Sequence, residues 1–234
     1  MASKQWYELD EKLTGRRYAM ALVRKQPSAV LLLMQMFIIV LMPWFDGRQH
    51  ARAIFAGLSL AALTLAVWTV RSTPALTRLA LFIALPAIVL EVWSVIDPQN
   101  TPVVVIAHLL LSFFYFYTGY ALVQYIFADR FVTKDELFAV GAAFTVFVFA
   151  FAYTFIAIQE IWPGSFTNYA GDLRVSFHEI LYGSVANLTS VGSTDIIPLR
   201  PHARAVVMIE QIAGVFYIAM VISRLVAMSA MRRT

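Results

Sequence analysis

The sequence predicts an all-α membrane protein with six transmembrane helices. Of its 234 residues 60% are hydrophobic and only 14% are charged, and the mean hydropathy is +0.72. Its apolar residues form blocks close to the ~20 residues that an α-helix needs to cross a hydrocarbon core. A shorter stretch between the last two blocks, 175–198, contains a run of small and hydroxyl residues. A water-soluble domain of this length does not carry such a balance of residues, whereas a polytopic membrane protein does.

The cysteine content and the charges exclude several other classes of protein. The sequence has no cysteine, so it offers neither disulfides nor thiolate metal ligands. Its pI is about 9.4, but the basic residues flank the apolar blocks, which indicates membrane topology and not binding to nucleic acid. The first residues, MASKQWYELDEKLTGRRY, are polar, so we expect no signal peptide.

The chain is predicted to have three parts. Residues 1–27 mix aromatic and basic side chains, as in an interfacial helix on the cytoplasmic leaflet, with a solvated tail as the alternative. Residues 28–127 form a predicted four-helix N-terminal membrane domain, and residues 128–234 form a domain around the stretch 175–198. The predicted spans cover about 28–44, 53–70, 79–96, 102–127, 137–158 and 203–230.

Six spans place both ends of the chain on the same side of the membrane. If this side is the cytoplasm, 13 of the 18 Lys and Arg residues lie there, in accord with the positive-inside rule. The five outer ones are Arg48, Arg52, Arg174, Arg200 and Arg204. The same orientation places the stretch 175–198 outside. We therefore expect a multi-pass protein of the cell membrane with both termini in the cytoplasm.

The stretch 175–198 predicts a pore. Its first part, VSFHEILYGSVANL, has the pattern of a helix, 175–188, that is too short to cross a membrane. A non-helical run, 189–194, follows and is closed by Asp195. Non-helical backbone at membrane depth occurs only where it is buried in protein or lines a water-filled path. Since its carbonyl and hydroxyl oxygens can replace the hydration shell of a cation, we interpret 175–188 as a re-entrant pore helix and 189–194 as an ion-binding filter.

The sequence LYGSVANLTSVGSTDIIP, residues 181–198, resembles the pore of the potassium-channel superfamily, in which an aromatic pore helix leads to T-x-T-T-V-G-Y-G-D. PGSF (163–166) and EQIAGVFYIAMVISRLV (210–226) resemble the outer turret and inner helix of a bacterial group with four extra N-terminal spans. The resemblance covers about residues 130–230, and 1–127 match only in the number of spans. It implies a homotetramer in a bacterial inner membrane, each subunit supplying one quarter of the filter to permeant monovalent cations.

Two filter positions depart from the family pattern, since Ser193 replaces the tyrosine and Thr194 the second glycine. The matching positions are Thr189, Ser190, Val191, Gly192 and Asp195. A β-branched residue at positive φ is strained by on the order of 1–3 kcal/mol, so we expect the outer filter near Thr194 to follow another path. Val-Gly-Ser-Thr is similar to Ile-Gly-Glu-Thr of cyclic-nucleotide-gated channels, which are non-selective. We therefore expect weak K⁺/Na⁺ selectivity; the alternatives are a K⁺-selective channel and a non-conducting sensor or partner subunit.

Four residues around the filter are further candidates. Asp195 either contributes to an acidic ring at the filter mouth, pairs with Arg200 or Arg204, or forms a hydrogen bond behind the filter. Glu179 and Glu210 are ionisable groups at membrane depth and thus functional candidates, which we expect to brace the filter by hydrogen bonding. Gly214 falls where the superfamily often has its gating-hinge glycine.

Gating by a charged fourth helix is not expected, because 102–127 contains no Lys or Arg. Few residues follow the last span, so we expect no soluble gating domain. The candidates for a hydrophobic gate, with ordinary helix packing as the alternative for each, are Phe216, Tyr217, Met220, Met228 and Met231. Arg224 either reaches lipid headgroups or faces the inner vestibule.

The sequence does not favour an enzyme or a secondary transporter. His50, His108, His178 and His202 lack ligand spacing such as H-E-x-x-H, and no G-x-S-x-G is present. A transporter would show paired broken helices in an inverted repeat, whereas this chain has one such stretch. We expect no cofactor and no metal beyond K⁺ and Na⁺ at the filter, and as partners only further copies of the chain and membrane lipids.

Overall fold

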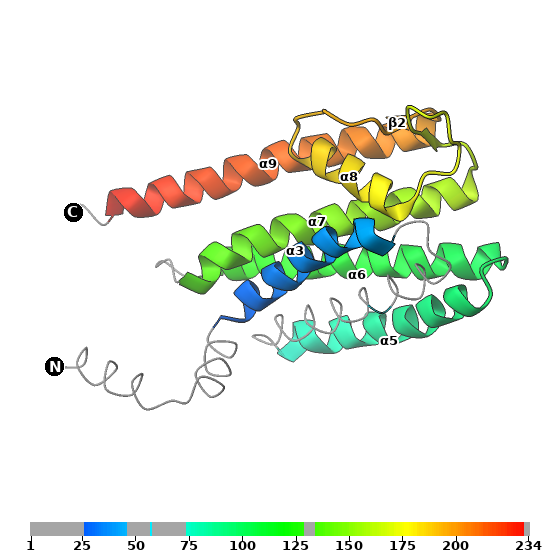
Figure 1. Ribbon diagram of the computed structural model, residues 1–234. Coiled ribbons are helices and arrows are strands. Elements are labelled where there is room, and N and C mark those ends of the chain that lie inside the picture. Colours follow the sequence, from blue (N-terminus) through cyan, green and yellow to red (C-terminus); the bar gives the residue numbers. More distant parts are fainter. Residues whose placement is uncertain (1–25, 46–56, 58–73, 129–133, 232–234) are drawn as a thin grey trace.

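The computed structural model describes residues 26–45, 57, 74–128 and 134–231. This part of the chain contains six helices and two short strands (Figure 1). In chain order they are α3 (Pro27–Phe45), α5 (Pro74–Ile96), α6 (Thr101–Ala128), α7 (Lys134–Ile161), β1 (Phe166–Thr167), α8 (Phe177–Leu188), β2 (Ile197–Pro198) and α9 (Pro201–Met231). The predicted interfacial segment 1–27 lies almost wholly outside the described residues, and so does most of the predicted span 53–70.

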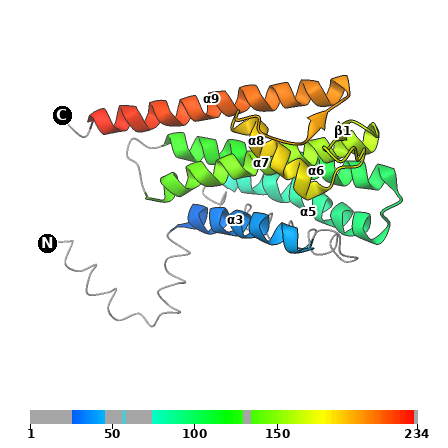
Figure 2. The same ribbon diagram turned by 45° about the horizontal axis from the view of Figure 1, so that its top comes forward.

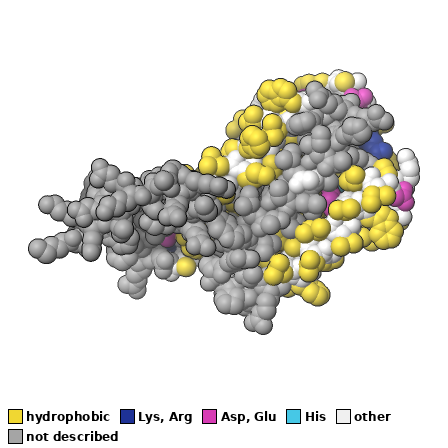
Figure 3. Space-filling model, turned by 60° about the horizontal axis from the view of Figure 1, so that its bottom comes forward, with side chains coloured by type: hydrophobic (Ala, Val, Ile, Leu, Met, Phe, Trp, Pro, Cys, Tyr) yellow, Lys and Arg dark blue, Asp and Glu magenta, His cyan; other side chains and the backbone are white. Residues whose placement is uncertain are grey.

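Five of these helices, α3, α5, α6, α7 and α9, are long and apolar enough to cross a membrane. Each contains one of the predicted spans or nearly all of it, and differs from it by a few residues at its ends. Side chains such as Phe82, Val89 and Phe216 are more than half exposed on their outer surfaces. The face in Figure 3 accordingly shows large hydrophobic areas and few charged side chains among its coloured residues. The prediction of a multi-pass, all-α membrane protein is therefore confirmed for the described part.

The helices form a bundle with α7 at its centre. Of the membrane-length part of α7, 78% is buried, against 22% for α9. Helix α6 packs along α7 on one side, α5 packs on α6, and α3 and α9 contact other faces of α7 (Figure 2). Buried alanines such as Ala142, Ala143 and Ala150 give α7 a narrow surface, which lets its neighbours approach closely. Helix α3 begins and α9 ends at the same end of the bundle.

The remaining helix, α8, belongs to an excursion of the chain between α7 and α9. Strands β1 and β2 pair in antiparallel fashion, with Phe166 opposite Pro198 and Thr167 opposite Ile197. The chain therefore enters and leaves this excursion at neighbouring points, on the end of the bundle opposite the end of α9. Helix α8 packs against both α7 and α9. The 12-residue α8 and the segment after it coincide with the predicted pore helix and filter.

Candidate pore and filter

Helix α8 begins where its sequence supplies a capping box. The Ser176 side chain accepts a hydrogen bond from the Glu179 backbone N–H, and the Glu179 carboxylate accepts one from the Ser176 N–H at 2.8 Å. Asn168 Nδ2 also donates to Glu179 at 2.9 Å. Partial burial acts to raise the pKa of Glu179, but the hydrogen bonds from Asn168 and Ser176 outweigh it and lower the pKa. Glu179 thus holds the start of α8, and its contacts are not with the segment 189–194.

The end of α8 is closed by hydrogen bonds that fold the chain back. Thr189 caps the helix with backbone φ −74° and ψ −10°, and its hydroxyl donates to the Val185 carbonyl at 2.8 Å. Ser190 N–H donates to Asn187 O at 2.9 Å, and Gly192 N–H donates to Ala186 O at 3.1 Å. These bonds attach the first half of the predicted filter to the last turn of the helix.

The backbone of this segment alternates in conformation. Ser190 and Gly192 have left-handed φ values of 58° and 67°, and Thr194 does not lie in this region. Ser190 is the one non-glycine residue of the described chain with positive φ, a conformation that costs about 1–3 kcal/mol and that persists only where surrounding contacts impose it. The alternation therefore stops at Gly192. This agrees with the expectation that Thr194 avoids a left-handed conformation.

The carbonyl groups of the segment fall into two classes. Gly192 O accepts a hydrogen bond from Thr194 N–H at 3.0 Å, and Ser193 O accepts one from the Tyr182 hydroxyl at 3.0 Å. Within the described part of the chain, no hydrogen bond reaches the three preceding carbonyls, those of Thr189, Ser190 and Val191. Free carbonyl oxygens of this kind are the groups that can replace cation hydration.

One buried junction joins α7, α8 and α9. The Ser184 hydroxyl of α8 lies 2.9 Å from Val148 O on α7 and forms a short hydrogen bond with Glu210 of α9. The Glu210 side chain is fully buried. Gln211, the next residue of α9, donates from Nε2 to Asn187 Oδ1 at 3.4 Å. Glu210 therefore braces the middle of α8, and its support of the filter through this helix stays a prediction.

The Asp195 carboxylate is half-buried just beyond the segment. The two arginines considered as its partners bind elsewhere, since Arg200 donates to Pro163 O at 3.1 Å and Arg204 to Pro198 O at 3.0 Å. Asp195 makes no hydrogen bond or ion pair with any residue that the structure describes. The predicted pairing with either arginine is therefore wrong for a single subunit, and the acidic ring at the mouth stays a prediction.

Ser190 and side chains of α9 line an open cavity with a volume of about 460 Å³. Its α9 residues are Gln211, Ile212, Val215 and Phe216. Phe216 is 65% exposed, which suits its predicted place at an inner gate. Gly214, in the same stretch, lies against the end of α8: a Cβ there would come within 1.9 Å of Leu188 O. Helix α9 continues unbroken through Gly214.

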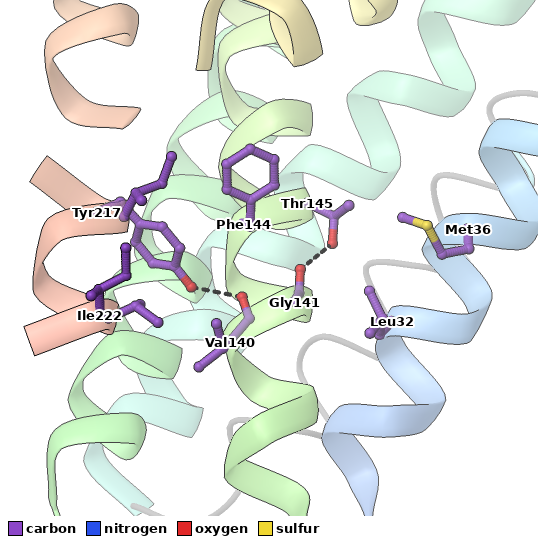
Figure 4. Close-up of a pocket in the computed structure, with 10 residues that line it drawn as sticks. Leu32, Met36, Val140, Gly141, Phe144, Thr145, Tyr217 and Ile222 are labelled. Carbon is purple, nitrogen blue, oxygen red and sulfur yellow. Dashed lines mark hydrogen bonds between the residues drawn. The ribbon is translucent and has the colours of Figure 1, made fainter. Parts of the chain in front are cut away.

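Two residues expected near the pore or its inner mouth point elsewhere. Tyr217 is buried beside an apolar pocket of about 400 Å³ between α3, α7 and α9, and its hydroxyl donates to Val140 O at 2.6 Å (Figure 4). It therefore packs on α7 and is not a gate residue in this conformation. Arg224 lies 3.5 Å from the Glu136 carboxylate and 5.0 Å above the Phe127 ring. Both alternatives predicted for Arg224 are therefore wrong here, because its side chain binds between α6, α7 and α9.

Comparison with known proteins adds one finding. Residues 141–230 match a protein-family model described as an ion channel. This match supports the resemblance of the region to pore domains of the potassium-channel superfamily. The region contains most of α7, all of α8 and the segment 189–194, and nearly all of α9. No curated protein and no solved structure that was compared with the chain matches it. The predicted resemblance over about 130–230 is thereby confirmed, and the domain indicates an ion channel.

Three residues of this pore domain were not identified from the sequence. Asn168 and Ser184 bind the two glutamates, and Tyr182 binds Ser193 in the segment 189–194. The Ser-x-x-Glu spacing of Ser176 and Glu179 was a recognisable signal for the start of the helix. No comparable signal marks Tyr182 or Ser184, because their partners lie 11 and 26 residues away.

Proposed function

We propose that this protein is a homotetrameric channel that passes K⁺ and Na⁺ across a cell membrane with weak selectivity. In this proposal α8 is the re-entrant pore helix and residues 189–194 form the filter. The observation that carries it is the alternating backbone at Ser190 and Gly192, together with three carbonyls that no described residue engages. Four copies of such a segment around an axis would supply rings of oxygen atoms to a dehydrated cation.

Weak selectivity follows from the outer half of the filter. Thr194 stands where the superfamily has a glycine, and it does not adopt a left-handed φ. The alternation of backbone conformations that aligns successive carbonyls therefore ends at Gly192, two residues before Thr194. Discrimination between K⁺ and Na⁺ depends on the number and geometry of coordinating carbonyls, so fewer rings give weaker discrimination.

Assembly of four subunits is supported by the exposed surface of the pore domain. Val191 in the proposed filter is 72% exposed. On α9, Ile209, Ile212 and Phe216 are each more than half exposed. In the tetramer these surfaces would face the pore axis or neighbouring subunits, and the remaining apolar surface would face lipid. We place both termini in the cytoplasm, because α3 begins and α9 ends at one end of the bundle and the filter excursion lies at the other. Helix α6 has no Lys or Arg, so the proposal includes no voltage sensor of that kind.

Reversal potentials of the purified protein in planar bilayers, with K⁺ on one side and Na⁺ on the other, test this function. We expect a reversal potential near zero. A value near the potassium limit would show a K⁺-selective channel, and the absence of any conductance would favour a non-conducting subunit. The matched variant Ser193→Tyr/Thr194→Gly restores the family pattern, and we expect it to shift the reversal potential toward the potassium limit.

A further inference from the structure

The hydroxyl of Tyr182 binds the backbone of the filter segment directly. Tyr182 lies on α8 with about half of its surface exposed, and its hydroxyl donates to Ser193 O at 3.0 Å. This carbonyl therefore points back toward the pore helix of its own subunit. A carbonyl that is turned toward a hydroxyl behind it cannot at the same time face a cation in front of it.

Ser193 is fixed from its other side as well. Thr194 N–H donates to Gly192 O at 3.0 Å, and the Thr194 hydroxyl accepts a hydrogen bond from Ile196 N–H at 3.1 Å. The buried Ile196 packs on α8 at Gly183, where an added Cβ would lie 3.2 Å from the isoleucine Cβ. The chain after the filter is thus held against α8, which keeps Ser193 within reach of Tyr182.

We propose that Tyr182 is a specificity-determining residue that confines the cation sites to the inner half of the filter. Its hydroxyl keeps the Ser193 carbonyl out of the ion path, so only the Thr189, Ser190 and Val191 carbonyls bind cations. This inference rests on the proposed channel function, and it assigns the loss of the outer sites to a particular hydrogen bond. The substitutions at Ser193 and Thr194 alone do not fix the direction of this carbonyl.

The physical consequence of removing the hydroxyl is a change in population. A neutral hydrogen bond of this type raises the population of the orientation in which the carbonyl points at α8, relative to the one facing the ion path, by roughly two- to tenfold. Without it, the Ser193 carbonyl has no partner on α8 and can turn toward the ion path, since Ser193 is exposed in the single subunit. A permeating cation is then the available partner. The outer filter would gain a ring of oxygen atoms.

The first test measures selectivity in planar bilayers for wild type, Tyr182→Phe and Tyr120→Phe. We expect the permeability ratio of K⁺ to Na⁺ to change by roughly two- to tenfold in Tyr182→Phe, with K⁺ favoured. Tyr120→Phe removes a tyrosine hydroxyl from α6 that accepts a hydrogen bond from Gln124 Nε2, and we expect it to leave the ratio unchanged. An unchanged ratio in Tyr182→Phe, with wild type weakly selective, would overturn the role of Tyr182 and leave the proposed channel function intact.

The second test does not depend on conduction. In protein labelled with carbon-13 at backbone carbonyls, solid-state NMR follows each filter carbonyl as K⁺ is exchanged for Na⁺. In wild type we expect the Thr189, Ser190 and Val191 carbonyl shifts to respond and the Ser193 shift to stay constant; in Tyr182→Phe the Ser193 shift should respond too. A wild-type Ser193 carbonyl that responds to the exchange would overturn the inference. A wild type that does not conduct would contradict the proposed function alone, because the NMR result would still decide the role of Tyr182.

Discussion

Gly214 of α9 lies directly against the carbonyl group of Leu188, the last residue of α8. A Cβ at position 214 would come within 1.9 Å of Leu188 O and 2.8 Å of its carbonyl carbon. Since both are backbone atoms, no side-chain rotation can relieve this clash. The structure thus gives Gly214 a packing role, which the sequence did not reveal, and its predicted role as a gating hinge stays a prediction.

Gly214→Ala should therefore destabilise the pore domain. The added methyl group forces α9 away from the end of α8, and overpacking of this kind costs about 1–3 kcal/mol. We expect a lower midpoint of thermal unfolding in detergent. Gly57→Ala is the matched control, because an added Cβ at position 57 meets nothing within 4 Å in the part of the chain that the structure describes. Equal stability of the two variants would show that α9 and α8 do not pack in this way.

Ser184 and Glu210 should show unequal tolerance to substitution. Glu210→Gln keeps an oxygen that can accept the Ser184 hydrogen bond, so we expect stability close to that of the wild type. Ser184→Ala removes the hydroxyl that joins Val148 and Glu210 and leaves a fully buried carboxyl without this partner. We expect a loss of about 1–3 kcal/mol, measured by thermal unfolding. A Glu210→Gln variant less stable than Ser184→Ala would contradict this account of the junction.

The sequence predicted the elements better than the contacts between them. The blocks of apolar residues placed α5 and α9 within five residues of their observed ends, because length and hydropathy determine a membrane span. The pore helix was predicted from 175, whereas Ser176 is its N-cap and α8 begins at Phe177. Which residues touch across α7, α8 and α9 depends on helix rotation and distance. Hence the hydrogen bond from Tyr182 to Ser193 and the inward packing of Tyr217 could not be predicted from spacing alone.

Acid should weaken the start of α8 through Glu179. Its pKa lies below the usual 4.5 in the folded protein, because hydrogen bonds from Asn168 and Ser176 outweigh the effect of burial. A carboxylate with a lowered pKa contributes stability above its unfolded pKa and loses it as the pH falls through the folded value. We expect the unfolding midpoint to fall as the pH is lowered below about 4.5, and to fall less in Glu179→Gln. An identical pH dependence in both proteins would exclude Glu179 as the titrating group.

Arg224 and Glu136 should behave as a coupled pair near the end of the bundle at which α9 ends. Their side chains are only 13% and 3% exposed, and their charged atoms lie 3.5 Å apart. Breaking a buried pair from one side leaves an uncompensated charge, at a cost of about 3–5 kcal/mol, whereas replacing both partners by apolar groups costs far less. We therefore expect Arg224→Met and Glu136→Leu each to lower the unfolding midpoint strongly, and the double variant to recover most of the loss. Additive effects would mean that the two side chains do not interact.

Because the pair links α9 to α7 beside Phe127 of α6, single variants that still fold should also change the open probability in bilayers, and the double variant should change it less.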